Sequence, residues 1–327
     1  MMMNKLLGLL LVCTTLTACA KEAPATQTSG QTATKPTLDA ETQQQLQQLL
    51  DQTRKNMIFV QGGSYMMGNF TKQLSPKVLK TFSFDTSGDI DPLHKVTLDS
   101  FSMSAHKATF AELDIYSKVT GKPRVSNSED VMRYRLPQSA AGMTWQQAQD
   151  YCQWLGTQLK LPMGLPTEAQ WEYVARNRGQ NVLYATDNGK FELGINVPSY
   201  EQQAIFAAKY KTSRTLSYPG QFKPTPLGFY DLISENYEWM QDWYDRNYYA
   251  HSPEHNPQGP ASGSKKVLRS AHAQDDFYFK YTSSFSINRY ADDPVIDAES
   301  KSDGMTPDYT NFNHSARCVV NSAQPLN

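Results

Sequence analysis

The chain has 327 residues and a formal net charge of -1 at pH 7, with 31 basic and 32 acidic side chains. This balance gives no reason to expect nucleic acid or a strongly charged surface as a partner. The 14 Phe, 18 Tyr and 5 Trp residues provide large side chains for a hydrophobic core. Beyond the first residues, no apolar stretch is long enough to span a bilayer.

Residues 1–18 have the pattern of a secretory signal peptide, with Lys5 before the apolar run LLGLLLV, which is too short to span a membrane. The Leu-Thr-Ala-Cys sequence that ends at Cys19 resembles a bacterial lipobox, in which the cysteine is lipidated and becomes the mature N-terminus. We therefore expect a lipid anchor at Cys19. Because Ala20 stands where an aspartate favours the inner membrane, the resemblance implies an outer-membrane lipoprotein that faces the periplasm. The alternative is ordinary cleavage near Ala20, with the cysteine incidental.

Residues 19–55 are rich in Thr, Gln, Ala and Ser and cannot bury enough apolar surface to fold alone. We assign them as the lipidated N-terminus and a flexible spacer. Within this spacer, residues 39–54 have a helix-forming composition and can form a helix when docked. The remaining residues, 56–327, suit one large domain.

The domain opens with two predicted strands in residues 57–68 (MIFVQGGSYMMG), separated by a Gly-Gly turn. Residues 92–101 (PLHKVTLDSF) alternate as a strand does, and a helix is predicted over residues 109–120. Two short amphipathic helices follow, over residues 144–155 and 167–176. Thr144 and Thr167 can cap them, because a threonine hydroxyl there accepts a free backbone N–H of the first turn.

Residues 164–173 (GLPTEAQWEY) closely resemble the Arg-Leu-Pro-Thr-Glu-Ala-Glu-Trp-Glu-Tyr signature of the formylglycine-generating enzyme, or sulfatase-modifying factor, family. Only Gly164 and Gln170 depart from it. The strands described above and residues 226–244 also match motifs of this family, so the resemblance covers most of the chain after Met57. It implies a mixed α+β fold that is related to C-type lectins and rich in loops.

The segment 226–244 (PLGFYDLISENYEWMQDWY) resembles the family motif Gly-Leu-Tyr-Asp-Met-x-Gly-Asn-Val-Trp-Glu-Trp, but Ser234 and Glu235 replace its Gly-Asn pair. In relatives this turn binds calcium. Glu235 and Glu238 could still supply the oxygen ligands that calcium prefers. The alternative is that Glu238 forms hydrogen bonds within the turn and no metal binds. Lys107 is a further departure, because relatives begin a Glu-Val-Thr triplet at this position.

Four cysteines are present, of which Cys13 lies in the signal peptide and Cys19 is the expected anchor. A remaining pair in the oxidising periplasm, Cys152 and Cys318, is typical of a disulfide. The resemblance implies the same bridge, because the matching cysteines are linked in several relatives.

Formylglycine-generating oxidases hold copper(I) with two cysteines that follow a Gly-Gly-Ser segment, since this soft ion selects thiolates. Residues 270–289, which match that region, contain no cysteine, so we expect no copper. A second branch of the family uses iron held by histidines on an added helical domain, for which there is no room before Met57. The sequence therefore predicts a member without catalytic activity.

Our hypothesis is an envelope lipoprotein whose loops bind an envelope or secreted protein, since loops on rigid scaffolds commonly carry binding sites. Neutralising a secreted toxin is one form of this role. We expect the binding surface in the segments with the least family character: residues 71–91, 121–138 and 200–223. The alternative is an oxidoreductase with a rearranged active site around His272, Asp275, Asp276 and Arg289.

Overall fold

The computed structural model of the protein describes residues 38–76, 89–127, 132, 135–212, 219–234, 236–272, 285–294 and 313–326. The fold belongs to the unit Leu38–Asn327. The predicted signal peptide and Cys19 lie outside the described residues. None of the described helices has both the length and the apolar character that crossing a membrane requires.

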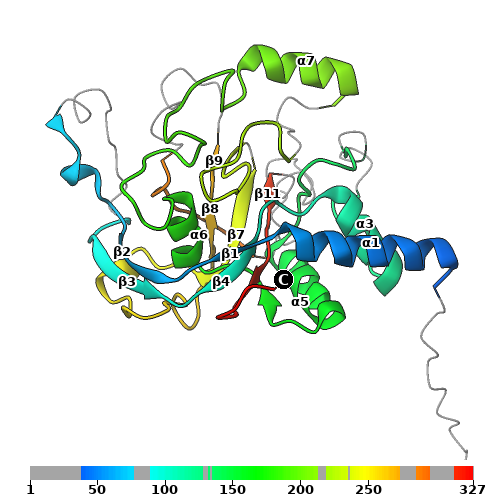
Figure 1. Ribbon diagram of the computed structural model, residues 1–327, viewed down its shortest axis with the longest axis horizontal. Coiled ribbons are helices and arrows are strands. Elements are labelled where there is room, and N and C mark those ends of the chain that lie inside the picture. The colour runs from blue at the N-terminus through cyan, green and yellow to red at the C-terminus, as the bar shows by residue number, and fades with distance from the viewer. Residues whose placement is uncertain are drawn as a thin grey trace, which may run out of the picture. The chain divides into compact units, whose positions relative to one another are not determined.

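The fold is a mixed α+β arrangement of short elements joined by long connections, as the sequence predicts (Figure 1). The helices are α1 (Ala40–Asn56), α3 (Phe110–Thr120), α5 (Trp145–Leu159), α6 (Glu168–Ala175) and α7 (Tyr200–Tyr210). The strands are β1 (Met57–Val60), β2 (Gly63–Met67), β3 (His94–Leu98), β4 (Phe101–Ser104), β5 (Met163–Gly164), β6 (Ile233–Ser234), β7 (Tyr237–Trp243), β8 (Lys266–Arg269), β9 (Ala271–His272), β10 (Tyr290–Asp292), β11 (His314–Ser315) and β12 (Val319–Val320).

Four helices begin with the same local device, in which a Ser or Thr at the N-cap and a Glu or Gln three residues later bond to each other's backbone. Their N-caps are Thr109, Thr144, Thr167 and Ser199. The predicted helices at 109–120, 144–155 and 167–176 are thus confirmed, although α5 continues to Leu159. The spacer helix is also confirmed as α1, with its N-terminus capped by Asp39.

Strands β1 and β2 pair with β4 and β3 as one long antiparallel ribbon, which runs along the lower edge of Figure 1. The register is the same in both halves, because Met57 lies opposite Ser104 and Met67 lies opposite His94. The ribbon is interrupted where residues 61–62 face residues 99–100, so the strand predicted at 92–101 is two strands. Gly62 is needed at this interruption, because a Cβ there would collide with the carbonyl oxygen of Leu98.

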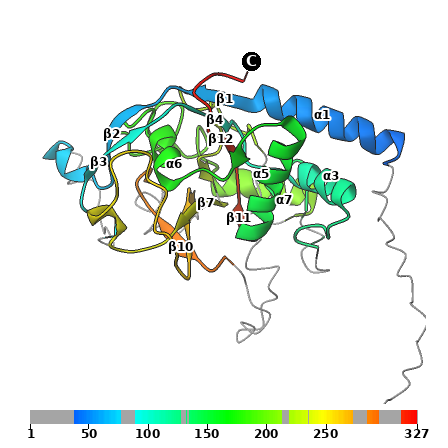
Figure 2. The same cartoon turned by 90° about the horizontal axis from the view of Figure 1, so that it is seen from below.

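Strand β12, near the C-terminus, occupies an inner position of a sheet in which β1 is an edge strand. β12 pairs antiparallel with β4 on one side and with β5 on the other, giving the order β1-β4-β12-β5. A second four-stranded sheet has the order β10-β8-β7-β11. Helices α1 and α3 lie side by side in both views (Figures 1 and 2).

Two clusters of buried apolar side chains form the core. One gathers around the ribbon and α6 and includes Phe101 and Trp171, and the other gathers around α3 and α5 and includes Trp239. The predicted disulfide between Cys152 and Cys318 is confirmed and lies inside the second cluster. It joins α5 to the residue that precedes β12.

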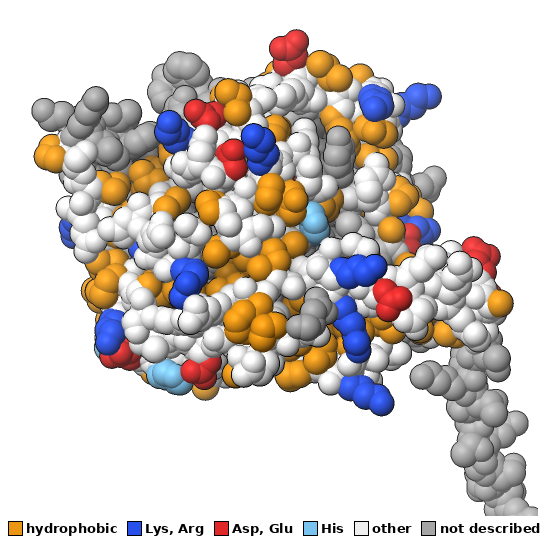
Figure 3. Space-filling model, viewed as in Figure 1, with side chains coloured by type: hydrophobic (Ala, Val, Ile, Leu, Met, Phe, Trp, Pro, Cys, Tyr) orange, Lys and Arg blue, Asp and Glu red, His pale blue; other side chains and the backbone are white. Residues whose placement is uncertain are grey.

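The face of the molecule in Figure 3 carries basic and acidic side chains interspersed, without a field of one sign. This distribution agrees with the net charge of -1 and gives no electrostatic footprint for nucleic acid on this face.

The disulfide closes a loop with a sequence separation of 166 residues, for which chain entropy predicts a stabilisation of about 5 kcal/mol. We expect the double variant Cys152→Ala/Cys318→Ala to lose most of this amount in denaturant unfolding. A reducing agent should lower the midpoint of the wild type and leave that of the double variant unchanged. Recovery of two free thiols by peptide mapping of the untreated protein would contradict this prediction.

Candidate functional site

Helix α6 carries two buried acidic side chains, Glu168 and Glu172, one turn apart. Oε1 of Glu168 accepts hydrogen bonds from Nη1 of Arg269 at 2.9 Å and from Nε of Arg289 at 2.8 Å, and its Oε2 accepts one from Nη2 of Arg289 at 2.9 Å. Oε2 of Glu172 accepts one from Nη2 of Arg269, also at 2.9 Å. We call these four residues the Glu168 network. Because all four are buried, water and salt screen their attraction only weakly.

The Glu168 network holds both ends of the segment that matches the copper-binding region of the oxidases. Arg269 comes directly before residues 270–288 and Arg289 directly after them, and both bind the same carboxylate. Nη2 of Arg269 also donates to the carbonyl oxygen of Ser286 at 2.7 Å. The ends of the segment are therefore fixed next to each other, while residues 273–284 lie outside the described part of the chain.

The carboxylate oxygens of the network have further partners within the protein. The hydroxyl of Tyr249 donates to Oε1 of Glu168 at 3.1 Å. Oε1 of Glu172 accepts from Nη1 of Arg176 at 2.7 Å and from the backbone N–H of Gly68 at 3.0 Å. Buried carboxylates are tolerated when they are paired and hydrogen-bonded in this way. The network therefore acts as an internal clamp and offers no exposed carboxylate for acid–base chemistry.

A third acidic side chain meets the first residue of α6. Oδ2 of Asp242, on β7, accepts a hydrogen bond from the backbone N–H of Glu168 at 2.9 Å. Burial, followed by the negative charge of Glu168, raises the pKa of Asp242 to about 7. This carboxyl group therefore takes up a proton near neutral pH.

The residues proposed for a rearranged active site are only partly placed by the structure. His272 lies at the end of β9, where it pairs with Ser234 of β6. Asp275 and Asp276 lie outside the described residues. Arg289 belongs to the Glu168 network and also donates from Nη1 to the carbonyl oxygens of Asp89 and Asp245 at 3.2 and 3.1 Å. The guanidinium of Arg289 thus forms hydrogen bonds within the protein from all three of its nitrogen atoms.

The predicted calcium turn contains a second buried ion pair. Both oxygens of Glu238 accept hydrogen bonds from Arg317, at 2.6 Å from Nε and at 3.0 Å from Nη2. The ammonium of Lys107 lies 3.7 Å from Oε1 of Glu238 and donates to the carbonyl oxygen of Asn236 at 2.6 Å. Both cationic side chains are almost fully buried.

Two positive charges therefore already compensate Glu238, where calcium would need uncommitted oxygen ligands. The described donor set favours the alternative, in which Glu238 bonds within the protein. Glu235 lies outside the described residues, so calcium binding at this turn stays a prediction from the resemblance. Among the residues that the structure describes, no group of three or more His, Cys, Asp or Glu side chains could hold a metal ion.

Sequence reasoning missed the two ion pairs, although it used the motifs that contain them. The available signal was the presence of Glu168 and Glu172 in a helix with buried aromatic side chains, together with arginines in the apolar segments around 269 and 317. Charged side chains at such positions are almost always paired.

Replacing Glu168 by Gln should leave the buried charge of Arg289 without its partner and place an amide donor against it. We expect the free energy of unfolding to fall by about 3 to 5 kcal/mol, which is typical when one member of a buried pair is removed. The control is Glu254→Gln, which breaks the exposed pair with Lys95 and should change stability little. A loss for Glu168→Gln as small as that of the control would show that the network is dispensable.

Ionisation of Asp242 should make stability depend on pH. Because its pKa is raised in the folded protein from 3.8 to about 7, the folded state holds a proton that the unfolded state releases, and the free energy of unfolding falls as the pH rises from about 4 to about 7. In Asp242→Asn this component of the fall should be absent, because the amide does not titrate and its oxygen can still accept from Glu168. Unfolding curves at several pH values in that window check this; equal slopes for both proteins would refute the raised pKa.

Comparison with known proteins agrees with the motifs and the fold. A family model described as the sulfatase-modifying factor enzyme 1-like domain matches residues 42–310. The chain is 29% identical over 233 residues to the serine/threonine-protein kinase pkn1 of Chlamydia pneumoniae, in a match that covers 65% of this chain and 32% of that protein. It is 29% identical over 189 residues to the formylglycine-generating enzyme of Streptomyces coelicolor, covering 54% and 51%. The chain thus spans well under two thirds of the length of either relative.

Among solved structures, PvdO from Pseudomonas aeruginosa is similar in fold, with a TM-score of 0.57 and 22% identity over 81% of this chain and 93% of that one. The likeness extends to the mixed α+β arrangement described above. Because the family model covers most of the sequence, the chain belongs to the family of the sulfatase-modifying factor enzyme 1-like domain.

Proposed function

We propose that this protein is a noncatalytic member of its family, which uses the scaffold as a binding module and is tethered to the outer membrane through Cys19. The proposal rests on two properties of the segment from Arg269 to Arg289, its lack of cysteine and the contacts of its last arginine. The segment contains no cysteine to hold copper, and the arginine at its end, which an oxidoreductase site would need, is fully engaged by Glu168 and by backbone carbonyls.

The Glu168 network suits a module that uses this part of the chain for recognition. Arg269 and Arg289 share one buried carboxylate, so the positions of these two residues are fixed before any partner binds. The same positions can therefore serve recognition in a chain that has lost the copper ligands. Function in this family is set by the site that the scaffold carries.

A second surface supports recognition of a protein. Helix α7 lies in the divergent segment 200–223 and buries only Phe206 among its residues, and it occupies the upper edge of Figure 1. Ile205 on this helix and Ile195 in the preceding turn are 61% and 69% exposed, and Tyr200 is 51% exposed. Large apolar side chains that are exposed on one segment of a surface can mark a protein interface. We call Ile195, Tyr200 and Ile205 the α7 patch.

The partner that we propose is a protein of the envelope or a secreted protein, for which a tethered module on the periplasmic side is suitably placed. A secreted toxin that must be neutralised near its source is one such partner. The interspersed charges near the patch, including Lys190, Glu192 and Glu201, favour a protein surface of mixed polarity.

Affinity purification of the tagged full-length protein from its native envelope tests the proposal. We expect a protein partner in stoichiometric amount, which is reduced at least tenfold in the double variant Ile195→Ser/Ile205→Ser. The matched control is Gln48→Ala, a change at an exposed position on α1 that should leave capture intact. Metal analysis of the same material should find neither copper nor iron.

Stoichiometric copper or iron, with oxygen consumption that depends on it, would overturn the proposal in favour of an oxidoreductase. Equal recovery of the partner by the wild type and the α7 variant would move the binding surface to one of the other divergent segments.

A further inference from the structure

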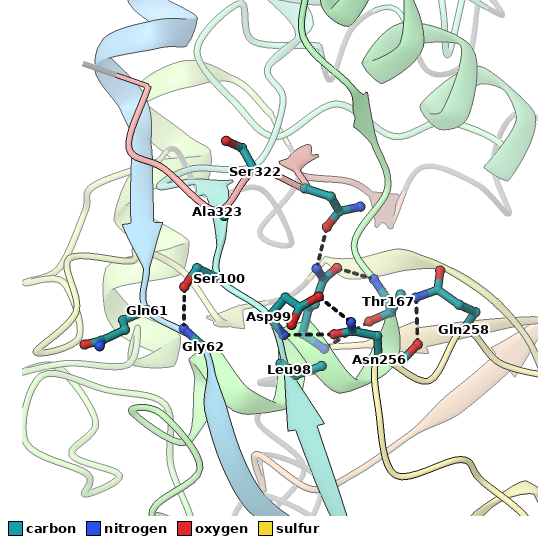
Figure 4. Close-up of a pocket in the computed structure, with 12 residues that line it drawn as sticks. Gln61, Gly62, Leu98, Asp99, Ser100, Thr167, Asn256, Gln258, Ser322 and Ala323 are labelled. Carbon is teal, nitrogen blue, oxygen red and sulfur yellow. Dashed lines mark hydrogen bonds between the residues drawn. The ribbon is translucent and has the colours of Figure 1, made fainter.

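A groove of about 640 Å³ opens where the β1–β2 and β3–β4 ribbon is interrupted (Figure 4). One wall is formed by the facing residues 61–62 and 99–100. The others are formed by the start of α6, by the segment around Asn256 and by residues 321–323 near the C-terminus. The volume lies within the range of pockets that hold small organic ligands.

Several polar side chains in the groove are each held by one hydrogen bond. Their remaining donors and acceptors make no hydrogen bond to the described residues. Oδ1 of Asn321 accepts from Nε2 of Gln170 at 2.7 Å, while its Nδ2 donates to none of the described residues. Oγ of Ser100 accepts from the backbone N–H of Gly62 at 3.0 Å, and its own proton is given to no described acceptor. The amide of Gln61 at the rim also makes no hydrogen bond within the described part of the chain.

The opposite side of the groove is held in the same manner. Asp99 and Asn256 form a reciprocal pair, in which the backbone N–H of Asp99 donates to Oδ1 of Asn256 at 2.9 Å and Nδ2 of Asn256 donates to Oδ2 of Asp99 at 2.8 Å. Figure 4 shows Asp99 and Asn256 side by side, with Thr167 and Gln258 next to them. Oriented donors and acceptors thus converge from separate elements, and the ordering is established before any ligand arrives.

The lining of the groove disfavours anionic ligands. None of the described residues that line the groove is a lysine or an arginine, and the carboxylate of Asp99, 3.3 Å from Nε2 of His255, faces solvent there. A phosphate or carboxylate would lose its hydration without gaining a cation in return. The groove therefore suits a neutral ligand that both donates and accepts hydrogen bonds.

The groove does not favour an extended peptide, because the edge of β3 beside it is already hydrogen-bonded. The backbone of Thr97 on β3 already donates to the carbonyl oxygen of Glu254 at 2.7 Å and accepts from the N–H of Asn256 at 2.9 Å. This contact covers the edge beside the groove, so a peptide cannot add there as a further strand. A polyhydroxylated ligand needs no strand edge, because each hydroxyl can donate to one side chain and accept from another.

We propose that this amide groove, formed by Gln61, Asp99, Ser100, Gln170, Asn256 and Asn321, binds a neutral saccharide. Asp99 and the amide oxygens accept from sugar hydroxyls, and the free N–H group of Asn321 donates to them. The site is separate in its residues from the α7 patch and from the Glu168 network, so the two functions can be tested independently.

A printed glycan array probed with the tagged full-length protein tests the assignment. We expect binding to neutral glycans in preference to sialylated or sulfated ones. For the neutral glycan that gives the strongest signal, titration calorimetry should show at least a tenfold loss of affinity in Asn321→Ala and in Ser100→Ala. Both changes remove a side chain at the groove without opening the core, and Gln48→Ala should bind as the wild type does.

Circular dichroism and the unfolding midpoint establish that each variant is folded. The assignment is overturned if no neutral glycan binds, if acidic glycans bind better, or if folded Asn321→Ala retains full affinity. Preferential capture on a peptide array, lost in the same variant, would also overturn it in favour of a peptide site. If Asn321→Ala still recovers the protein partner, binding of the partner does not depend on the amide groove, and the two proposals stand or fall separately.

Discussion

The carboxylate of Glu168 is the contact on which the other parts of the domain depend. It stands at the first residue of α6, receives two arginines from distant parts of the chain and joins the ribbon side of the core to the β8 strand. A buried charge is costly unless each of its charged partners, here the two arginines, is in place. The fold therefore specifies the positions of Arg269 and Arg289 more tightly than apolar packing alone could do, because an apolar contact has no preferred direction.

The local elements could be predicted because their signals are local. The capping threonines at 109, 144 and 167 determine where helices begin, and the spacing of apolar side chains on α5 determines which face is buried. The pairing of the strands could not be predicted in the same way. Residues 57–68 and 92–101 look like two separate strand segments, and only the register shows that they form one ribbon with a common interruption.

The functional features also differ in whether the sequence could predict them. The cysteine pair was predictable, because two cysteines remained after the leader and the anchor were set aside. The occupation of Glu238 by Arg317, 79 residues away along the chain, was not, because side chains that meet across so long a separation leave no periodic pattern. The amide groove was missed for a related reason: its residues come from five separate segments, and single Gln, Asn and Ser residues in loops are ordinary in any sequence.

The central position of β12 has a consequence for biogenesis. The strand that completes the β1-β4-β12-β5 sheet is made within the last residues of the chain, and Cys318 directly precedes it. Because a chain is synthesised from its N-terminus, Cys152 emerges long before Cys318 does. Until then that thiol has no native partner, and the sheet stays open between β4 and β5. The thiol of Cys152 therefore has to stay free of wrong partners while more than 160 further residues are synthesised, because 166 positions separate the two cysteines.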